Sequence, residues 1–130
     1  MNKKFTLAIF LIIILSNFSK AYSIEADVFV QSTVNRAAKT LGGNLSKEER
    51  IVKLKEIAKD TVDIEGIGFY SLGANRKNAT EDQINKYKAA FSEYFLKSFS
   101  SRLAEYSNPE IEVNSKKIIN ENYTIVLSTL

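Results

Sequence analysis

A long amphipathic stretch between Thr80 and Tyr106 constrains the fold more than any other part of the sequence. Its first residues, Thr80 to Gln83, have the form of a capping box, in which each side chain bonds the backbone amide of the other residue. Apolar side chains then recur at steps of three and four residues, at Ile84, Tyr87, Phe91, Tyr94, Phe95, Phe99, Leu103 and Tyr106. Polar side chains occupy the opposite face, at Lys86, Glu93, Lys97, Ser100 and Arg102. We therefore expect one helix of about seven turns that buries an aromatic face and ends at Asn108-Pro109, because the residue before a proline avoids helical geometry.

The residues before this stretch contain three shorter helical segments. Residues 25–41 space their apolar side chains as a helix does, and we expect Gly42-Gly43 to end that helix in a left-handed conformation. Ser46 to Glu49 have the form of another capping box, followed by a second helix. Residues 62–73 predict a short third helix that stops at Gly73, although each glycine inside it weakens it by about 1 kcal/mol.

The C-terminal residues predict a β-hairpin. Both halves, 110–119 and 122–130, are rich in β-branched side chains, and residues 120–122 have turn composition. The apolar side chains fall on two faces, Ile111 and Val113 on one, and Tyr123, Ile125 and Leu127 on another. The expected elements are therefore helices first and strands last. A two-stranded sheet is marginal alone and leaves an unpaired apolar edge, so we expect the sequence to be a fragment that lacks the C-terminal part of its domain.

The first 23 residues have the pattern of a secretory signal peptide. A basic start precedes an apolar run from Phe5 to Leu15, which is too short to span a membrane, and small residues suit cleavage after Ala21 or Ser23. The chain has 18 Lys and Arg against 15 Asp and Glu, and three of the basic residues lie in this leader. Residues 24–130, the single expected domain, are therefore close to neutral, which argues against a nucleic-acid partner.

The composition excludes most familiar hydrolase chemistry. The sequence contains no histidine and no cysteine, so it lacks the commonest general base, the commonest metal ligand and any Ser-His or Cys-His pair. One carboxylate cluster, Asp60, Asp63 and Glu65, keeps open the alternative of a small exported enzyme. We expect no enzyme activity, no catalytic residue, no cofactor and no metal.

Taken in order, the motifs resemble those of the MlaC or toluene-tolerance family. The matching elements are Val62-Asp63, Leu72-Gly73, Ala79-Thr80, Ala90-Phe91, Tyr94, Ser101, Leu103 and Tyr106, behind a signal peptide and ahead of a hairpin. Two departures are Asn75-Arg76, where relatives carry an aromatic pair, and Asp60, where a proline is common. The packing that those positions contribute in relatives does not carry over to this chain.

The resemblance implies a periplasmic phospholipid carrier. The fold class that it implies is α+β, with N-terminal helices packed on one side of a curved antiparallel sheet that is incomplete in this fragment, and lipid tails between the two layers. The implied partners are a phospholipid ligand, an inner-membrane ABC transporter complex and an outer-membrane lipoprotein complex. The residues we expect to line the tails are Ile67, Leu72, Phe91, Tyr94, Phe95, Phe99 and Leu103. Two readings stay open beside this one: ordinary core packing at each of these positions, and an exported protein–protein adaptor domain without lipid cargo.

Overall fold

The computed structural model describes residues 24–129, which form an α+β fold. The elements in chain order are α2 (Ala26–Gly42), α3 (Lys47–Thr61), α4 (Ile64–Ser71), the 3-10 helix η1 (Gly73–Lys77), α5 (Glu81–Leu103), β1 (Glu112–Asn120) and β2 (Tyr123–Thr129). This confirms the predicted class, with an incomplete, two-stranded antiparallel sheet. The predicted leader lies outside the described residues. No helix within residues 24–129 has the length and apolar character to cross a membrane.

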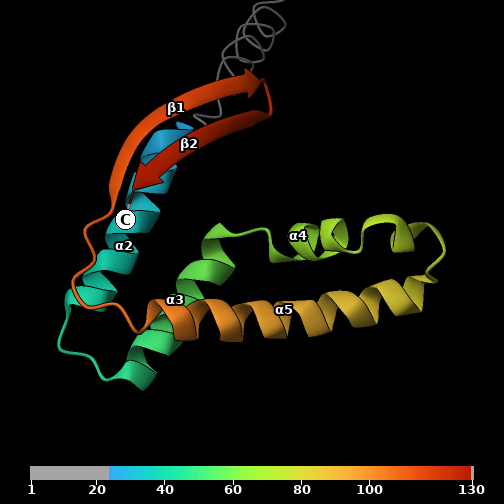
Figure 1. Ribbon diagram of the computed structural model, residues 1–130, viewed down its shortest axis with the longest axis horizontal. Helices are drawn as coiled ribbons and strands as arrows, with labels where there is room; N and C mark the ends of the chain where they lie inside the picture. The colour runs from blue at the N-terminus through green and yellow to red at the C-terminus, as the bar shows by residue number, and fades with distance from the viewer. Residues whose placement is uncertain (1–23, 130) are drawn as a thin grey trace, which may run out of the picture.

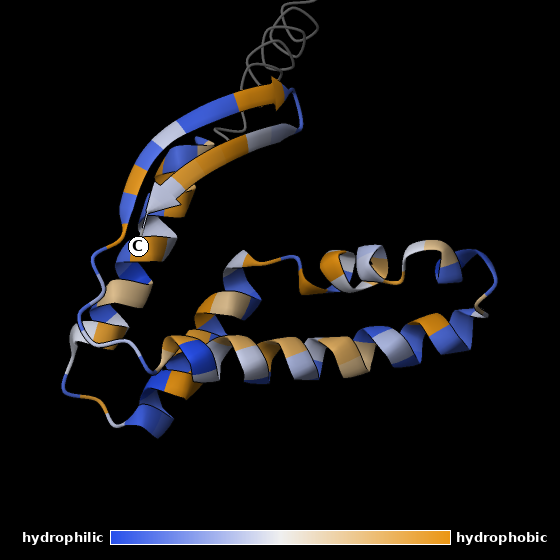
Figure 2. Cartoon of the chain, in the orientation of Figure 1, coloured by the Kyte–Doolittle hydropathy of each residue, from blue (hydrophilic) through white to orange (hydrophobic). Residues whose placement is uncertain are grey.

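The elements form two arms joined by α3 (Figure 1). In one arm the curved hairpin lies along α2. In the other, α4 runs beside the long helix α5, and η1 closes the far end. Apolar and polar residues alternate around α5, so this helix has one side suited to packing and one suited to water (Figure 2). In the hairpin, the apolar residues lie near the ends of β1 and in the middle of β2. Of the helices, α2 is the one that packs on the sheet, whereas α3, α4 and α5 pack mainly on one another.

Two capping boxes fix where α3 and α5 begin, as the sequence predicts. At α3 the Glu49 amide donates to Ser46 Oγ at 3.2 Å, and the Ser46 amide donates to the Glu49 carboxylate at 2.8 Å. That backbone hydrogen bond holds the pKa of the Glu49 carboxyl below its ordinary value. Thr80 and Gln83 repeat the arrangement at α5, with distances of 3.3 and 2.9 Å. Both predicted helix starts are therefore confirmed.

The helix ends agree less well with prediction. Gly73 does adopt a left-handed conformation, with φ at 55°, after α4. Gly42, by contrast, is the last residue of α2, and Gly43 is extended with φ at −83°, so the predicted left-handed stop is wrong. The longest helix ends at Leu103 rather than at Asn108-Pro109, because 3-10 type bonds at Glu105 and Tyr106 replace the helical pattern.

The core lies where α2, α3 and α5 meet. Its fully buried members are Leu41 near the end of α2, Leu54 in the middle of α3, and Ala104 directly after α5. Ser100 is 0% exposed beside them, which corrects its prediction to the polar face. Its hydroxyl is satisfied inside the helix by the Leu96 carbonyl at 2.6 Å, so burying it leaves no unpaired group.

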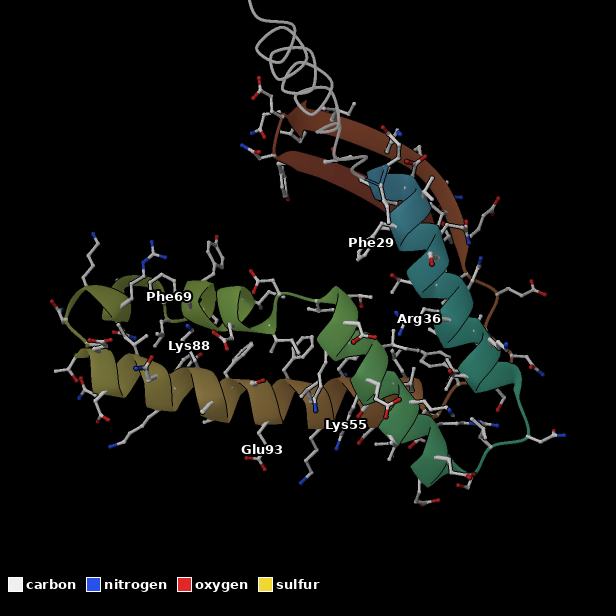
Figure 3. All side chains as sticks on the ribbon, turned by 180° about the vertical axis from the view of Figure 1, so that it is seen from behind. Phe29, Arg36, Lys55, Phe69, Lys88 and Glu93 are labelled. Carbon is white, nitrogen blue, oxygen red and sulfur yellow. The ribbon has the colours of Figure 1, made fainter. Side chains whose placement is uncertain are left out.

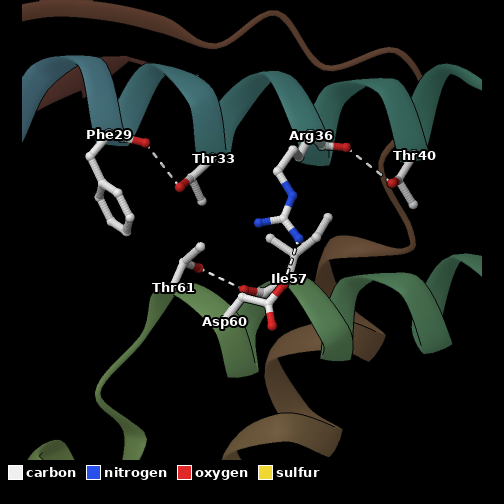
Figure 4. Close-up of polar contacts among 7 residues, drawn as sticks. All are labelled: Phe29, Thr33, Arg36, Thr40, Ile57, Asp60 and Thr61. Carbon is white, nitrogen blue, oxygen red and sulfur yellow. Dashed lines mark hydrogen bonds and ion pairs between the residues drawn. The ribbon is translucent and has the colours of Figure 1, made fainter. Parts of the chain in front are cut away.

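Ion pairs tie α2 to its neighbours. The Arg36 guanidinium donates to the Asp60 carboxylate at 2.7 Å, which joins α2 to the end of α3 (Figure 4). On the other side of α2, the Lys116 ammonium on β1 bonds Glu25 at 2.6 Å and Asp27 at 2.8 Å. The bonds from Lys116 hold the pKa of Asp27 below and raise the pKa of Lys116 above their ordinary values.

The hairpin turns over Glu121 and Asn122, as predicted, and has one face toward α2. Lys116 pairs with Val126 in the register, so both share the face that contacts α2. Side chains alternate along a strand, which places Tyr123, Ile125 and Leu127 on the opposite face, as the sequence predicts. All three are exposed there.

Candidate functional site

A row of stacked aromatic rings runs along α5. It consists of Tyr87, Phe91, Phe95 and Phe99, one residue per helical turn, and we call it the aromatic row. Successive ring centroids are 6.0, 6.1 and 5.4 Å apart, with interplanar angles of 26° or less. The first three rings are half-buried, and Phe99 is the most exposed of the four. The four rings form one continuous apolar strip along the helix.

The short helix α4 covers the first half of the aromatic row. Gly68 approaches Phe91 so closely that a Cβ atom there would stand 2.8 Å from the ring. Next to this contact, the Ser71 and Tyr87 hydroxyls are hydrogen-bonded at 2.8 Å. Apart from these contacts, α4 buries only the side chain of Ile64. The cover is therefore a short helix, most of whose residues remain exposed.

Charged groups flank the covered rings without facing them. Lys88 on α5 reaches the Glu65 carboxylate on α4 at 3.0 Å, and Figure 3 shows Lys88 between these two helices. Glu93, further along α5, points away from α4 in the same view. The strip between the two helices is thus apolar in its rings and closed on one flank by a single ion pair.

Five of the seven predicted lining residues divide between the aromatic row and the surface around it. Phe91, Phe95 and Phe99 belong to the aromatic row. Ile67, on α4, is 44% exposed. Tyr94 is 70% exposed on another side of α5, where it lines a shallow hollow of about 380 Å³ with Lys97 and Arg102 among others.

The last two predicted lining residues lie at the ends of the packed region. Leu72 is half-buried and caps the end of α4. Leu103 packs against the core cluster of Leu41, Leu54 and Ala104. The structure therefore brings three of the predicted side chains into one row and distributes the other four around it.

Sequence reasoning missed two residues of this site. Tyr87 was recognised as apolar but was not assigned to the lining, although it begins the aromatic row. Gly68 was read only as a weak point of its helix, yet its missing side chain is what admits Phe91. A signal for Gly68 did exist: a short helix that keeps two glycines, Gly66 and Gly68, has a packing reason to do so.

Larger hollows lie elsewhere and have a different character. Two of them, of about 650 and 630 Å³, run along α2 and the start of β1. Their walls include charged and amide side chains such as Asp27, Gln31 and Asn35, and none of the predicted lining residues. Volume alone would favour these hollows, but their walls mix apolar side chains with charged and amide groups, which suit an acyl chain less well than a continuous row of rings, so we place the candidate site at the aromatic row.

The carboxylates of the possible enzyme site have separate structural partners. Asp60 pairs with Arg36, Glu65 pairs with Lys88, and Asp63 caps α4 by accepting from the Gly66 amide at 3.0 Å. Within residues 24–129, no three His, Cys, Asp or Glu side chains gather to hold a metal ion. The cluster read from the sequence is therefore three unrelated contacts in space.

Comparison with known proteins gives one match. A family model described as MlaC protein matches residues 30–130, which is more than half of the chain. No curated protein matches, and no solved structure matches.

Proposed function

Because the chain belongs to the MlaC family, we propose that it is a periplasmic phospholipid carrier, the soluble component of an ABC transport system. Family membership suggests phospholipid-binding transport rather than enzyme activity. Our extension is the route: lipid passes between an outer-membrane lipoprotein complex and an inner-membrane ABC transporter complex. We propose that the leader predicted at residues 1–23 exports the protein to the compartment between them.

The observation that carries the proposal is the aromatic row beneath a short, largely exposed helix. Exposing one acyl chain of ~16 carbons to water costs about 12 kcal/mol at roughly 0.8 kcal/mol per methylene. A carrier lowers this cost by offering apolar walls of comparable length. Successive ring centroids about 6 Å apart give the row a run of just over three helical turns, long enough to follow much of such a chain.

We propose that lipid tails contact Ile67, Leu72, Phe91, Tyr94, Phe95, Phe99 and Leu103. Stacking supports Phe91, Phe95 and Phe99, which share the row. The positions of Tyr94, on another side of α5, and of Leu103, against the core, supply no comparable support. The row residues are therefore the first to test.

Mass spectrometry tests this function directly. The full chain would be exported, purified from the periplasm without detergent and analysed for co-purified phospholipid. We expect bound phospholipid in the wild type and its loss in the double variant Phe91→Ser/Phe95→Ser. The matched control, Phe29→Ser/Tyr106→Ser, removes two exposed aromatics outside the row and should keep its lipid. Wild-type protein that is consistently empty would overturn the proposal.

An adaptor domain without lipid cargo is the second candidate, and one surface favours it. Tyr123, Ile125 and Leu127 form an exposed apolar face on the hairpin, turned away from α2. An apolar face of this kind is typical of a protein-docking surface. If this reading holds, Tyr123→Ser/Leu127→Ser should abolish complex formation with a partner, while the purified wild-type protein contains no phospholipid.

A further inference from the structure

The far end of the α4–α5 arm presents two exposed aromatic side chains beside two cations. Tyr70 is 79% exposed and Phe69 is 40% exposed, although both belong to a helix of only eight residues. Arg76 and Lys77 follow in η1, and both are exposed. We call these four residues the arm tip, since α4 and η1 lie at the end of the molecule away from the hairpin (Figures 1 and 3).

Two side chains of the arm tip, Arg76 and Phe69, are in contact. The Arg76 guanidinium carbon lies 5.5 Å from the centre of the Phe69 ring, which is within cation–π range. A ring with a cation above it combines a large apolar surface with a positive charge in one small place. Side chains of this kind, an aromatic body with a polar end and a basic group on a long stem, are enriched where protein meets the membrane–water interface.

The neighbouring charges leave the arm tip positive. Three acidic side chains lie near it, Glu65, Glu81 and Asp82. Glu65 is paired with Lys88 at 3.0 Å, and Asp82 with Lys86 at 2.9 Å. Neither Arg76 nor Lys77 makes an ion pair with any residue of the part that the structure describes. Glu81 is the one acid nearby that could offset them, so a net positive charge remains at the tip.

We propose that the arm tip docks on the surface of a phospholipid bilayer that contains anionic lipid. The rings of Phe69 and Tyr70 enter the headgroup region, and Arg76 and Lys77 contact lipid phosphates. This inference rests on the proposed function and adds the surface from which lipid is collected or to which it is delivered. Gly68, the residue before Phe69, touches Phe91, so docking brings the aromatic row next to the bilayer.

Size favours a bilayer over a protein as the partner. A stable protein–protein interface buries about 800 Å² and some 20–30 residues on each side. The arm tip consists of a few protruding side chains on a short helix and a 3-10 turn, without the flat extended patch that such an interface needs. A bilayer requires no matching shape, and attraction to its anionic surface grows with each basic side chain that approaches it.

Vesicle co-flotation tests the inference with the purified full chain. The probes are vesicles of phosphatidylcholine alone and vesicles of phosphatidylcholine with phosphatidylglycerol. We expect wild-type protein to float with the anionic vesicles and weakly with the neutral ones. Arg76→Gln/Lys77→Gln should weaken binding to anionic vesicles by about thirtyfold, because each basic side chain near such a surface supplies roughly a fivefold factor.

Further variants distinguish vesicle binding by the arm tip from non-specific hydrophobic binding. Phe69→Ser/Tyr70→Ser should lose vesicle binding at every salt concentration, whereas the charge variant should lose only the salt-sensitive part. The matched control is Phe29→Ser/Tyr106→Ser, which removes two exposed aromatics outside α4 and η1 and should bind as the wild type does. Circular dichroism checks that each variant is folded. If the aromatic variant does not fold, the charge variant, whose substitutions lie outside α4, still tests the inference.

The outcomes distinguish this inference from the proposed function. The inference is overturned if the wild-type protein does not bind anionic vesicles, or if the tip variants and the control variant bind them equally well. The arm tip would then be a contact surface for a protein partner. Phospholipid found bound to that same protein would show that the carrier function stands without it. If the protein binds vesicles but never contains phospholipid, the result would instead support docking by the arm tip and overturn the proposed carrier function.

Discussion

Gly68 lies directly against the ring of Phe91, and a Cβ atom on Gly68 would stand only 2.8 Å from Phe91 Cδ1. Cβ atoms do not approach other heavy atoms so closely, so α4 reaches its position on α5 because residue 68 has no side chain. The ring has little freedom to move aside, since it is stacked between Tyr87 and Phe95. One absent methyl group therefore determines how tightly the aromatic row is covered.

Gly68→Ala should lower the free energy of unfolding by about 1 kcal/mol. Alanine favours a helix over glycine by about 1 kcal/mol, but overpacking a close contact costs roughly 1–3 kcal/mol, so the clash wins. Urea unfolding measures the difference. Gly43→Ala is the matched control: its new Cβ would lie 3.4 Å from the nearest atom, an ordinary contact, and should cost nothing. If Gly68→Ala costs as much in a Phe91→Leu background, the contact is not the cause.

Local sequence signals predicted where elements begin, because a cap is made by residues close in the chain. Ser46 with Glu49 and Thr80 with Gln83 form the capping boxes that their spacing predicts. The hairpin turn and the left-handed Gly73 are equally local. Each depends on a handful of neighbouring residues, so the amino-acid types alone are informative.

The contacts that build the candidate site are not local, and here prediction from sequence was weaker. Gly68 matters through Phe91, which belongs to another helix, so a helix-propensity rule reads it only as a weakness. Ser100 is polar yet buried, because its hydroxyl bonds the carbonyl of its own helix. Tyr94 fits an apolar spacing of three and four residues but lies outside the stacked row. Periodicity gives a broad face, and packing selects a narrow part of it.

The three carboxylates Asp60, Asp63 and Glu65 should matter for stability and not for function. Asp63→Ala removes the cap of α4 and should cost about 1 kcal/mol. Asp60→Ala breaks a largely exposed pair with Arg36 and should cost less than about 1 kcal/mol. Urea unfolding measures both, and mass spectrometry of bound phospholipid should find the wild-type amount in all three alanine variants. If the alanine variants lost their function in the cell while keeping their stability, the result would instead favour the alternative of a small exported enzyme.

Lys116 should make the attachment of the hairpin to α2 depend on pH at both extremes. The pKa of Asp27 is lowered from 3.8 in the folded protein. Its contribution to the free energy of unfolding is therefore present above that pH and is lost as the pH falls through the lower, folded-state pKa. The pKa of Lys116 is raised from 10.5 in the folded protein. Its contribution to the free energy of unfolding is therefore present below that pH and is lost as the pH rises through the higher, folded-state pKa. Lys116→Met should flatten both dependences, although each effect is small because these groups are exposed to solvent.

Lys117→Met provides the control for that measurement. Lys117 neighbours Lys116 but pairs with Ile125 on the opposite face of the hairpin, away from Asp27. Urea midpoints measured at neutral pH, below pH 3.8 and above pH 10.5 should match the wild type in this variant. Equal changes in the two methionine variants would contradict a specific role for the bonds to Glu25 and Asp27, as would a persistent effect in high salt.

A disulfide across Gly68 and Phe91 would test whether α4 must move for lipid to reach the aromatic row. The chain contains no cysteine, so an introduced pair has no competitor. A Cβ on residue 68 would lie 3.5 Å from the Cβ of Phe91, which is within the range of real disulfides.

The two cysteines of Gly68→Cys/Phe91→Cys should therefore form a disulfide readily. The oxidised form should be more stable than the reduced form of the same variant by about 3 kcal/mol. If lipid reaches the row by displacement of α4, the oxidised protein should fail to take up a fluorescent phospholipid, and dithiothreitol should restore uptake in the same sample. Comparing the two redox states of one variant cancels the effect of removing the Phe91 ring. Uptake that is equal before and after reduction would show that lipid does not pass beneath α4, and would shift the search for its path to the exposed face of the hairpin.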